Sequence, residues 1–529
     1  MKKHILTSKY LWLLLSLLSI VACNEPDDVL ADYNVLPAAP EELPALTAGS
    51  ANFSKYVAIG ATFTAGFTDG ALFKASQQNS FPSILAGEFA KAGGGSFTQP
   101  MMNDNFGGLA LAGTRIQDPR LVFGGAGPVS LESIIGPVTV TTDIALNNPT
   151  GPFNNLGVPG AKSYHLFYNG FGNIANLPSA ANPYFVRMTG ATPNASVMDL
   201  AMAQNPTFFT LSEIGGNDVL GYATSGGTGV DQTGNSDPST YGNNDITDPT
   251  VFASVLNNEV ALLTSGGAKG LITNVPYITD LPHFTTVPYN PIPLDGATAD
   301  FLNSASAYGA YNAGVQQALA YLVSVNAITQ QIADAELAKR TIHFEASETN
   351  AVVIMDEDLI DLTAINPALI SMRQATEDDL FVLPAASFIG TEAVPNNPQT
   401  VNGVAIPLAD KWVLTPEEQA AIKTATDAYN STIEGIASSN ASVGLVDLKG
   451  ILSQLASTGY AYGDYILTAD LVTGGAVSLD GIHLTARGYA LMAGAFLDAI
   501  DANFGSNFAA SGNIPDASMY GTNYSPTLQ

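Results

Sequence analysis

The chain has 529 residues, of which 46% are hydrophobic and only 12% are charged, and its formal net charge is −29. This apolar content supplies an ample core and excludes a wholly disordered chain. The acidic excess argues against nucleic acid and anionic lipid as electrostatic partners, because both would be repelled.

The N-terminus has the features of a secretory signal. Three lysines accompany an apolar run at residues 10–23, which is too short to span a bilayer comfortably. The run ends in IVAC, which resembles a bacterial lipobox, and this resemblance implies a signal peptide over residues 1–22 and lipidation of Cys23. Cys23 is the only cysteine, so it cannot form an internal disulfide. An ordinary signal peptide with a chance cysteine is the alternative.

The residues after Cys23 predict where the protein is displayed. Residues 24–28 (NEPDD) resemble the export tag of surface-exposed lipoproteins in some Gram-negative bacteria. Residues 23–50 are rich in Pro and Ala and are expected to form the lipidated N-terminus and a flexible tether. We therefore expect a cell-envelope protein that is lipid-anchored to the outer membrane and exposed at the surface.

Beyond the tether, short apolar segments alternate with helical ones, which is typical of an α/β fold with a parallel sheet. The predicted strands are 56–59, 208–214, 271–275, 352–355 and 443–446. The predicted helices are 251–264, 301–325, one that opens at Thr415, and 486–504. The sequence TPEE at Thr415 offers a threonine cap, a proline at the first helical position and a glutamate that completes a capping box.

One segment interrupts this alternation. Residues 221–250 consist largely of Gly, Ser, Thr, Asn and Asp, and they predict a long loop that acts as a lid or mobile insertion. The Asp and Asn side chains offer oxygen ligands for Ca²⁺, although the spacing of a known calcium loop is absent. A solvated loop is the favoured interpretation.

Three separated motifs carry residues suited to acyl chemistry. Asp480 and His483 are three apart in a turn, where a carboxylate can accept the imidazole Nδ1–H and leave Nε2 free to act as a base. Asn217 follows the predicted strand 208–214, so its amide can donate to a developing oxyanion at the carboxyl edge of the sheet, or merely cap the next segment. Gly160 follows a Val-Pro turn and offers a backbone N–H to the same oxyanion.

Taken in order, these motifs resemble the SGNH/GDSL hydrolase family. Its first block typically reads GDSLTAG, and residues 60–66 read GATFTAG. The resemblance implies a triad of Thr62, His483 and Asp480, with an oxyanion hole formed by Thr62, Gly160 and Asn217. It also implies a flavodoxin-like three-layer α/β/α sandwich with a central parallel sheet. The hydrolase domain would cover residues 51–510, with insertions at about 221–250 and 280–440 forming a lid or cap, and residues 511–529 would be a C-terminal tail.

The first block departs from the family at two positions. Thr62 stands where the family has the nucleophilic serine, and Ala61 stands where it has aspartate. A threonine hydroxyl can act as a nucleophile, but its extra methyl restricts χ1 and needs room beside the attacking oxygen.

Four other residues near these motifs are further candidates. Glu213 ends a buried strand, where it is either an acid of raised pKa near the oxyanion loop or, in the favoured interpretation, a solvent-facing strand end or a partner in a structural ion pair. Asp218 is a further candidate for the pocket. His165 and His283 follow turns and either line the pocket or have plain structural roles, which is the favoured interpretation.

Two functions are compatible with these residues. The first is an ester hydrolase that acts on a lipid or an acylated glycan, with no cofactor and no metal. The second is a weakly active or inactive lipoprotein that binds a lipid or glycan or assists an outer-membrane transporter. Gly160, Asn217, Asp480 and His483 favour the enzyme, and Ala61 and Thr62 favour the binder.

Overall fold

The computed structural model describes residues 43–528. Residues 46–509 and 513–528 form one compact unit, and residues 43–45 and 510–512 belong to a second unit that carries no helix or strand in its described part. The predicted signal peptide, the lipidation site Cys23 and most of the tether lie outside the described residues. None of the helices within residues 43–528 combines the length and the apolar character needed to cross a membrane.

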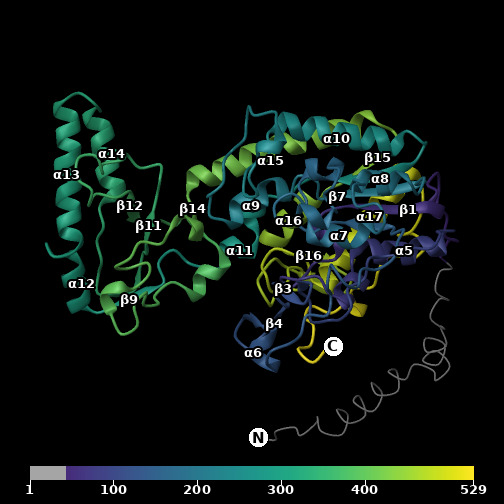
Figure 1. Ribbon diagram of the computed structural model, residues 1–529, viewed down its shortest axis with the longest axis horizontal. Coiled ribbons are helices and arrows are strands. Elements are labelled where there is room, and N and C mark those ends of the chain that lie inside the picture. The colour runs from purple at the N-terminus through teal and green to yellow at the C-terminus, as the bar shows by residue number, and fades with distance from the viewer. Residues whose placement is uncertain (1–42, 529) are drawn as a thin grey trace, which may run out of the picture. The chain divides into compact units, whose positions relative to one another are not determined.

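The main unit is built on a five-stranded sheet in which every strand is parallel to its neighbours (Figure 1). In chain order the strands are β1 (Tyr56–Gly60), β6 (Asn155–Gly157), β7 (Phe208–Ser212), β8 (Lys269–Thr273) and β15 (Val443–Val446). In space they run β6-β1-β7-β8-β15, which is the doubly wound order 2-1-3-4-5. The prediction of an α/β fold with a central parallel sheet is confirmed.

Side chains alternate between the two faces of the sheet and form two separate cores. One face, which includes Val57, Ile59 and Phe209, packs against α8 (Val197–Met202), α10 (Pro249–Thr264) and α15 (Pro416–Ser439). The opposite face, with Tyr56, Ala58 and Phe208, packs against α5 (Phe81–Lys91) and α17 (Ala486–Phe504). All five residues of β1 and of β7 are buried, as expected for strands that are covered on both sides.

One predicted strand lies outside the central sheet, and one strand of the sheet was not predicted. Residues 352–355 were expected beside the other predicted strands, but β11 (Val353–Met355) pairs antiparallel with β12 (Met372–Gln374) outside the central sheet. The edge strand β6 was not predicted, because only three residues pair and its sequence, Asn-Leu-Gly, has no extended apolar run.

Helix ends follow the local sequence closely. The capping box at the start of α15 is present, since Thr415 N–H donates to Glu418 Oε2 at 2.7 Å and Glu418 N–H donates to Thr415 Oγ1. The single helix expected over 301–325 is instead two helices, α12 (Gly296–Asn303) and α13 (Tyr308–Ser324). Ser304 breaks it, because its backbone is extended and its hydroxyl accepts from Ser306 N–H, a bond that competes with helix formation.

Two long segments lie outside the central sheet: the first connects β8 to α15, and the second is residues 221–250. Between β8 and α15 lie short antiparallel pairs and three longer helices, which are held by the buried ion pairs of Arg373 with Asp356 and Asp379. The segment 221–250 is a largely irregular segment, yet it is ordered by the carboxylate of Asp245, which accepts from the N–H groups of Val230 and Gly242. The remaining elements of the first segment are α11 (Pro282–Thr285), β9 (Ile292–Leu294), α14 (Gln330–Arg340), β10 (Ser347–Asn350), β13 (Leu380–Phe381), η8 (Asp410–Trp412) and β14 (Val413–Leu414).

The other elements are short and surround the sheet. They are α3 (Thr62–Ala65), α4 (Lys74–Gln78), β2 (Leu109–Leu111), β3 (Thr114–Gln117), β4 (Leu121–Phe123), β5 (Pro128–Ser130), α6 (Leu131–Ile135), η2 (Ser163–Phe167), α7 (Pro183–Thr189), α9 (Asn217–Thr224), α16 (Leu448–Ser457), β16 (Tyr460–Tyr462) and β17 (Tyr465–Leu467). Within the C-terminal segment, Tyr524 packs edge-on against Phe73, and the carbonyl of Ser525 accepts from the buried guanidinium of Arg120.

Candidate active site

The candidate site lies at the carboxyl ends of β1 and β7, the adjacent strands at which the strand order reverses. Ligands bind at this position in doubly wound sheets, because the connections leaving the two strands diverge and open a crevice. Thr62 begins α3 two residues after β1 ends, and Asn217 begins α9 just beyond β7. Asp480 and His483 come from the turn that precedes α17.

Asp480 and His483 are joined as the sequence predicts, with 2.9 Å between Asp480 Oδ2 and His483 Nδ1. Burial by itself would raise the pKa of Asp480. The contact with the imidazole and the backbone N–H groups of Ile482 and His483 outweigh burial and hold the pKa of Asp480 well below its usual range. Gly70 N–H also donates to Oδ2, at 2.7 Å. The carboxylate is therefore ionised and aimed at Nδ1, which leaves Nε2 for a substrate.

His283 supports this turn and is not one of the residues that line the adjoining pocket. Its backbone N–H donates to the carbonyl of Gly481 at 3.0 Å, and its Nδ1 lies 3.1 Å from the carbonyl oxygen of Asp480. Gly481 has a φ of +75°, and a Cβ there would lie 2.7 Å from His283 N, so only glycine fits. The favoured structural interpretation of His283 agrees with this position.

Two donors converge on the hydroxyl of Thr62. Its Oγ1 accepts from Gly160 N–H at 3.3 Å and from Asn217 Nδ2 at 3.2 Å. Asn217 Nδ2 also donates to the carbonyl of Ala161, so its side chain faces Thr62 and does not cap α9. Within residues 43–528, no hydrogen bond joins Thr62 Oγ1 to His483. The hydroxyl thus accepts hydrogen bonds from the two groups that are expected to hold an oxyanion.

The carboxylate of Glu213 accepts hydrogen bonds from the loop that carries Thr62. Its Oε1 accepts from the N–H groups of Ala61 at 2.7 Å and Thr64 at 3.0 Å. Glu213 directly follows β7, which pairs with β1, and it is buried and forms no ion pair in the described structure. The favoured interpretation of Glu213 as a solvent-facing strand end or an ion-pair partner is therefore wrong. Glu213 reaches the loop from a left-handed backbone conformation, with φ of +52°, which is uncommon for a non-glycine residue. Burial raises the pKa of Glu213 to about 8, despite these two hydrogen bonds.

We expect Glu213 to make stability depend on pH. Because its folded pKa of about 8 exceeds the ordinary value of 4.5, its contribution is fully present at low pH and is lost as the pH rises through 8. Glu213→Gln keeps the acceptor oxygen and removes this titration. In urea denaturation the variant should gain stability over the wild type from pH 5 to 8.5, by about 4 kcal/mol at most at about 1.4 kcal/mol per pKa unit. Parallel pH profiles would contradict the burial of this acid.

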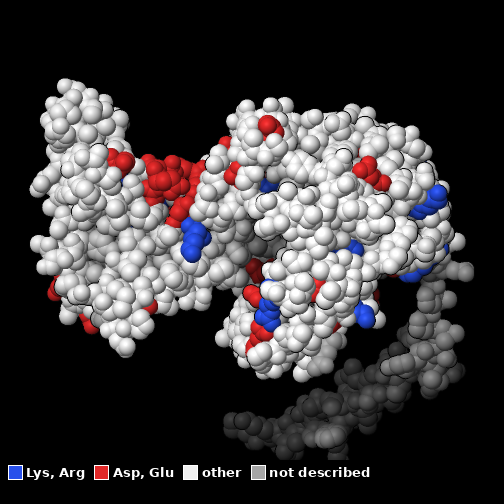
Figure 2. Space-filling view, in the orientation of Figure 1, with Lys and Arg blue, Asp and Glu red and all other residues white. Residues whose placement is uncertain are grey.

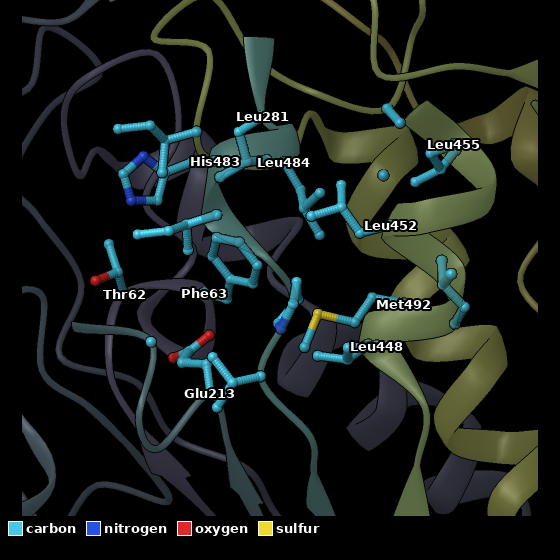
Figure 3. A pocket seen from close by; sticks show the side chains of 18 of the residues that line it. Thr62, Phe63, Glu213, Leu281, Leu448, Leu452, Leu455, His483, Leu484 and Met492 are labelled. Carbon is cyan, nitrogen blue, oxygen red and sulfur yellow. The ribbon is translucent and has the colours of Figure 1, made fainter. Parts of the chain in front are cut away.

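An apolar pocket opens beside Thr62 and His483, and its empty space, including the open mouth, is about 860 Å³. In Figure 3, Thr62 and His483 lie on one side, and Leu448, Leu452 and Leu455 project from α16 on the other. Glu213 is part of the lining, as is Met492 from α17. The pocket suits an extended hydrocarbon group held next to the catalytic candidates.

Known proteins do not identify this site. No protein-family model, curated protein or solved structure compared with the chain matches it. Its chemistry must be inferred from geometry.

The other predicted residues have structural positions. Asp218 is buried, and its two carboxylate oxygens accept from the N–H and the hydroxyl of Ser163, so it ties the Gly160 loop to α9 and does not line the pocket. His165 stacks on Phe171 and accepts at Nδ1 from Lys162 N–H. Burial lowers the pKa of His165 to about 3, which keeps the ring neutral.

Sequence motifs did not reveal the rest of the pocket. Phe63 lines the pocket, and its ring lies 5.8 Å from the His483 ring, centroid to centroid; Phe67, which is not part of the lining, lies 4.7 Å from the same ring. Leu448, Leu452 and Leu455 recur at helical spacing, but such spacing also describes any helix that faces a core.

Proposed function

We propose that the protein is an SGNH/GDSL-type ester hydrolase that uses Thr62, His483 and Asp480, and that its substrates carry a long acyl chain. One observation supports this proposal: the Thr62 hydroxyl, which accepts from two hydrogen-bond donors, and the carboxylate-bound His483 belong to residues that line one apolar pocket. A lipid or an acylated glycan at the cell envelope is the substrate class that follows. No step needs a cofactor or a metal ion.

In the proposed reaction, Thr62 Oγ1 turns away from Gly160 N–H and Asn217 Nδ2 and attacks the ester carbonyl carbon. His483 Nε2 takes the hydroxyl proton, and Asp480 stabilises the imidazolium. The carbonyl oxygen becomes an oxyanion and takes the place of the hydroxyl on the two donors, together with Thr62 N–H. The proton then passes to the departing alkoxide, and water releases the acid from Thr62 by the same sequence of transfers.

A second function is favoured by one feature of the same site. The Thr62 hydroxyl lies on the oxyanion donors and makes no hydrogen bond with His483 in the described structure. A threonine fixed in that rotamer would leave a pocket that binds a lipid or glycan without cleaving it, or that serves an outer-membrane transporter.

Residue 62 offers the experiment that separates the two functions. Purified wild type, Thr62→Ala and Thr62→Ser are assayed with short and long p-nitrophenyl esters. The enzyme proposal expects wild-type turnover that is abolished by Thr62→Ala and retained by Thr62→Ser. A silent wild type with turnover gained in Thr62→Ser would favour the binder. Turnover that survives Thr62→Ala would overturn the role of Thr62 in either case.

We also propose that the chain is anchored to the outer membrane through a lipid on Cys23. Labelled fatty acid should be incorporated into the wild type, and Cys23→Ala should release the protein from the membrane fraction. Equal labelling of the two chains would contradict the lipobox assignment.

A further inference from the structure

Three carboxylates from separate parts of the chain converge outside the candidate active site. They belong to Glu357 after β11, Asp410 in η8 and Glu418 in the first turn of α15, and one oxygen of each lies within 4.8 Å of the others. Most of the surface viewed in Figure 2 is uncharged, and acidic side chains gather near β14, which directly follows η8.

No basic side chain neutralises this cluster. Among residues 43–528, none of the three carboxylates forms an ion pair with Lys or Arg. Three basic residues near the cluster have other contacts: Lys411, next to Asp410 in the chain, lies over the Trp412 ring, Lys339 pairs with Glu417, and Arg373 pairs with Asp356 and Asp379.

Two buried oxygens of these carboxylates have no hydrogen-bond partner among the described residues. Glu418 is only 4% exposed, and its Oε2 accepts from Thr415 N–H in the capping box, but its Oε1 has no hydrogen-bond partner in the described structure. Asp410 Oδ1 also has no hydrogen-bond partner in the described structure. A buried anionic oxygen without a donor is costly, so a cation or a proton is needed there.

Two glycines pack closely against this region, one against the Glu418 carboxylate and the other against the backbone of Asp410. A Cβ on Gly227 would lie 1.5 Å from Glu418 Oε1, and a Cβ on Gly226 would lie 2.2 Å from the carbonyl oxygen of Asp410. Both have positive φ, +62° and +75° for Gly226 and Gly227. The backbone that begins the 221–250 segment therefore approaches the acids as closely as bare backbone allows.

We propose that Glu357, Asp410 and Glu418 bind a calcium ion. Ca²⁺ takes oxygen ligands at about 2.3–2.6 Å, so two ligands of one ion lie at most about 5 Å apart, and the three carboxylates meet this limit. Mg²⁺ requires shorter bonds and stricter octahedral geometry, and Zn²⁺ favours nitrogen and sulfur ligands, which the cluster lacks. The ion would join the segment that carries Glu357 to α15, and through α15 to the sheet.

The test is calcium binding by the full chain after treatment with EGTA. Isothermal titration with CaCl₂ and thermal unfolding with and without 1 mM CaCl₂ are measured on the wild type, Glu357→Gln, Asp410→Asn and Glu418→Gln. Glutamine at residue 418 can still complete the capping box, so that variant removes charge and keeps the cap. Glu348→Gln, at an exposed carboxylate of β10, is the matched control.

The wild type and Glu348→Gln should bind Ca²⁺ and show a higher Tm when it is present, because a ligand specific to the folded state stabilises it. Each cluster variant should bind at least tenfold more weakly and lose most of the Tm shift. Because Glu357 is exposed, its variant remains informative if Glu418→Gln does not fold. A wild type that neither binds nor shifts, cluster variants that shift as the wild type does, or an equal shift with MgCl₂ would each overturn the assignment.

Discussion

Asp480→Asn should lower kcat/KM for esters by on the order of 10⁴-fold, as loss of the orienting carboxylate does in comparable triads. The amide oxygen can still accept from the N–H groups of Ile482 and His483, as Asp480 Oδ1 does now. The amide nitrogen then faces His483 Nδ1, which must become an acceptor. The ring proton moves to Nε2, and the imidazole can no longer act as a base.

Asp464→Asn is the control for this variant, because Asp464 is an exposed carboxylate between β16 and β17. It should retain wild-type kcat/KM, and circular dichroism should show that both variants are folded. Steady-state assays with a short p-nitrophenyl ester make the comparison. If Asp480→Asn kept more than a tenth of the activity, the triad would be wrong.

Leu452→Trp should convert a long-chain hydrolase into one that prefers short chains. The larger side chain would fill the side of the pocket that lies opposite Thr62 and His483 (Figure 3). Each methylene excluded from an apolar site costs about 0.8 kcal/mol. Excluding three or four of them should lower kcat/KM for a long acyl ester by on the order of 100-fold relative to a short one, at about 1.4 kcal/mol for each factor of ten.

Ile466→Trp controls for the added bulk, because Ile466 is 74% exposed in β17 and does not line the pocket. The measurement is the ratio of kcat/KM for long and short p-nitrophenyl esters. A ratio that is the same in the wild type and Leu452→Trp would show that the acyl chain lies elsewhere.

Much of the fold could be predicted because the local sequence of most central strands has a recognisable apolar pattern. Four of the five strands are apolar runs buried on both faces, and the capping box at Thr415 fixes the start of α15. The three-residue edge strand β6 could not be found, because pairing with β1 and not its own composition makes it a strand. The break between α12 and α13 depends on one serine hydroxyl inside an otherwise helical pattern.

The site was predictable where residues are fixed by short spacing or where separated motifs resemble those of a known family. Asp480 and His483 lie three apart, so their contact follows from the turn between them. The meeting of Gly160 N–H and Asn217 with Thr62 was expected from the family resemblance. Two other features depend on contacts across strands and segments that no local pattern encodes. They are the hydrogen bonds from the Ala61 loop to Glu213, and the cluster of Glu357, Asp410 and Glu418.

The candidate site is assembled from opposite ends of the chain. The hydrogen bond from Gly70 N–H to Asp480 Oδ2 spans 410 positions, so Thr62 is synthesised long before Asp480 and His483. Even in a complete chain, Thr62 and His483 come together only when α17 docks against the sheet and brings the preceding turn to β1. If the chain is exported and hydrolyses esters as we propose, the unfolded chain would cross the inner membrane before its triad is assembled, and so without attacking the lipids it passes.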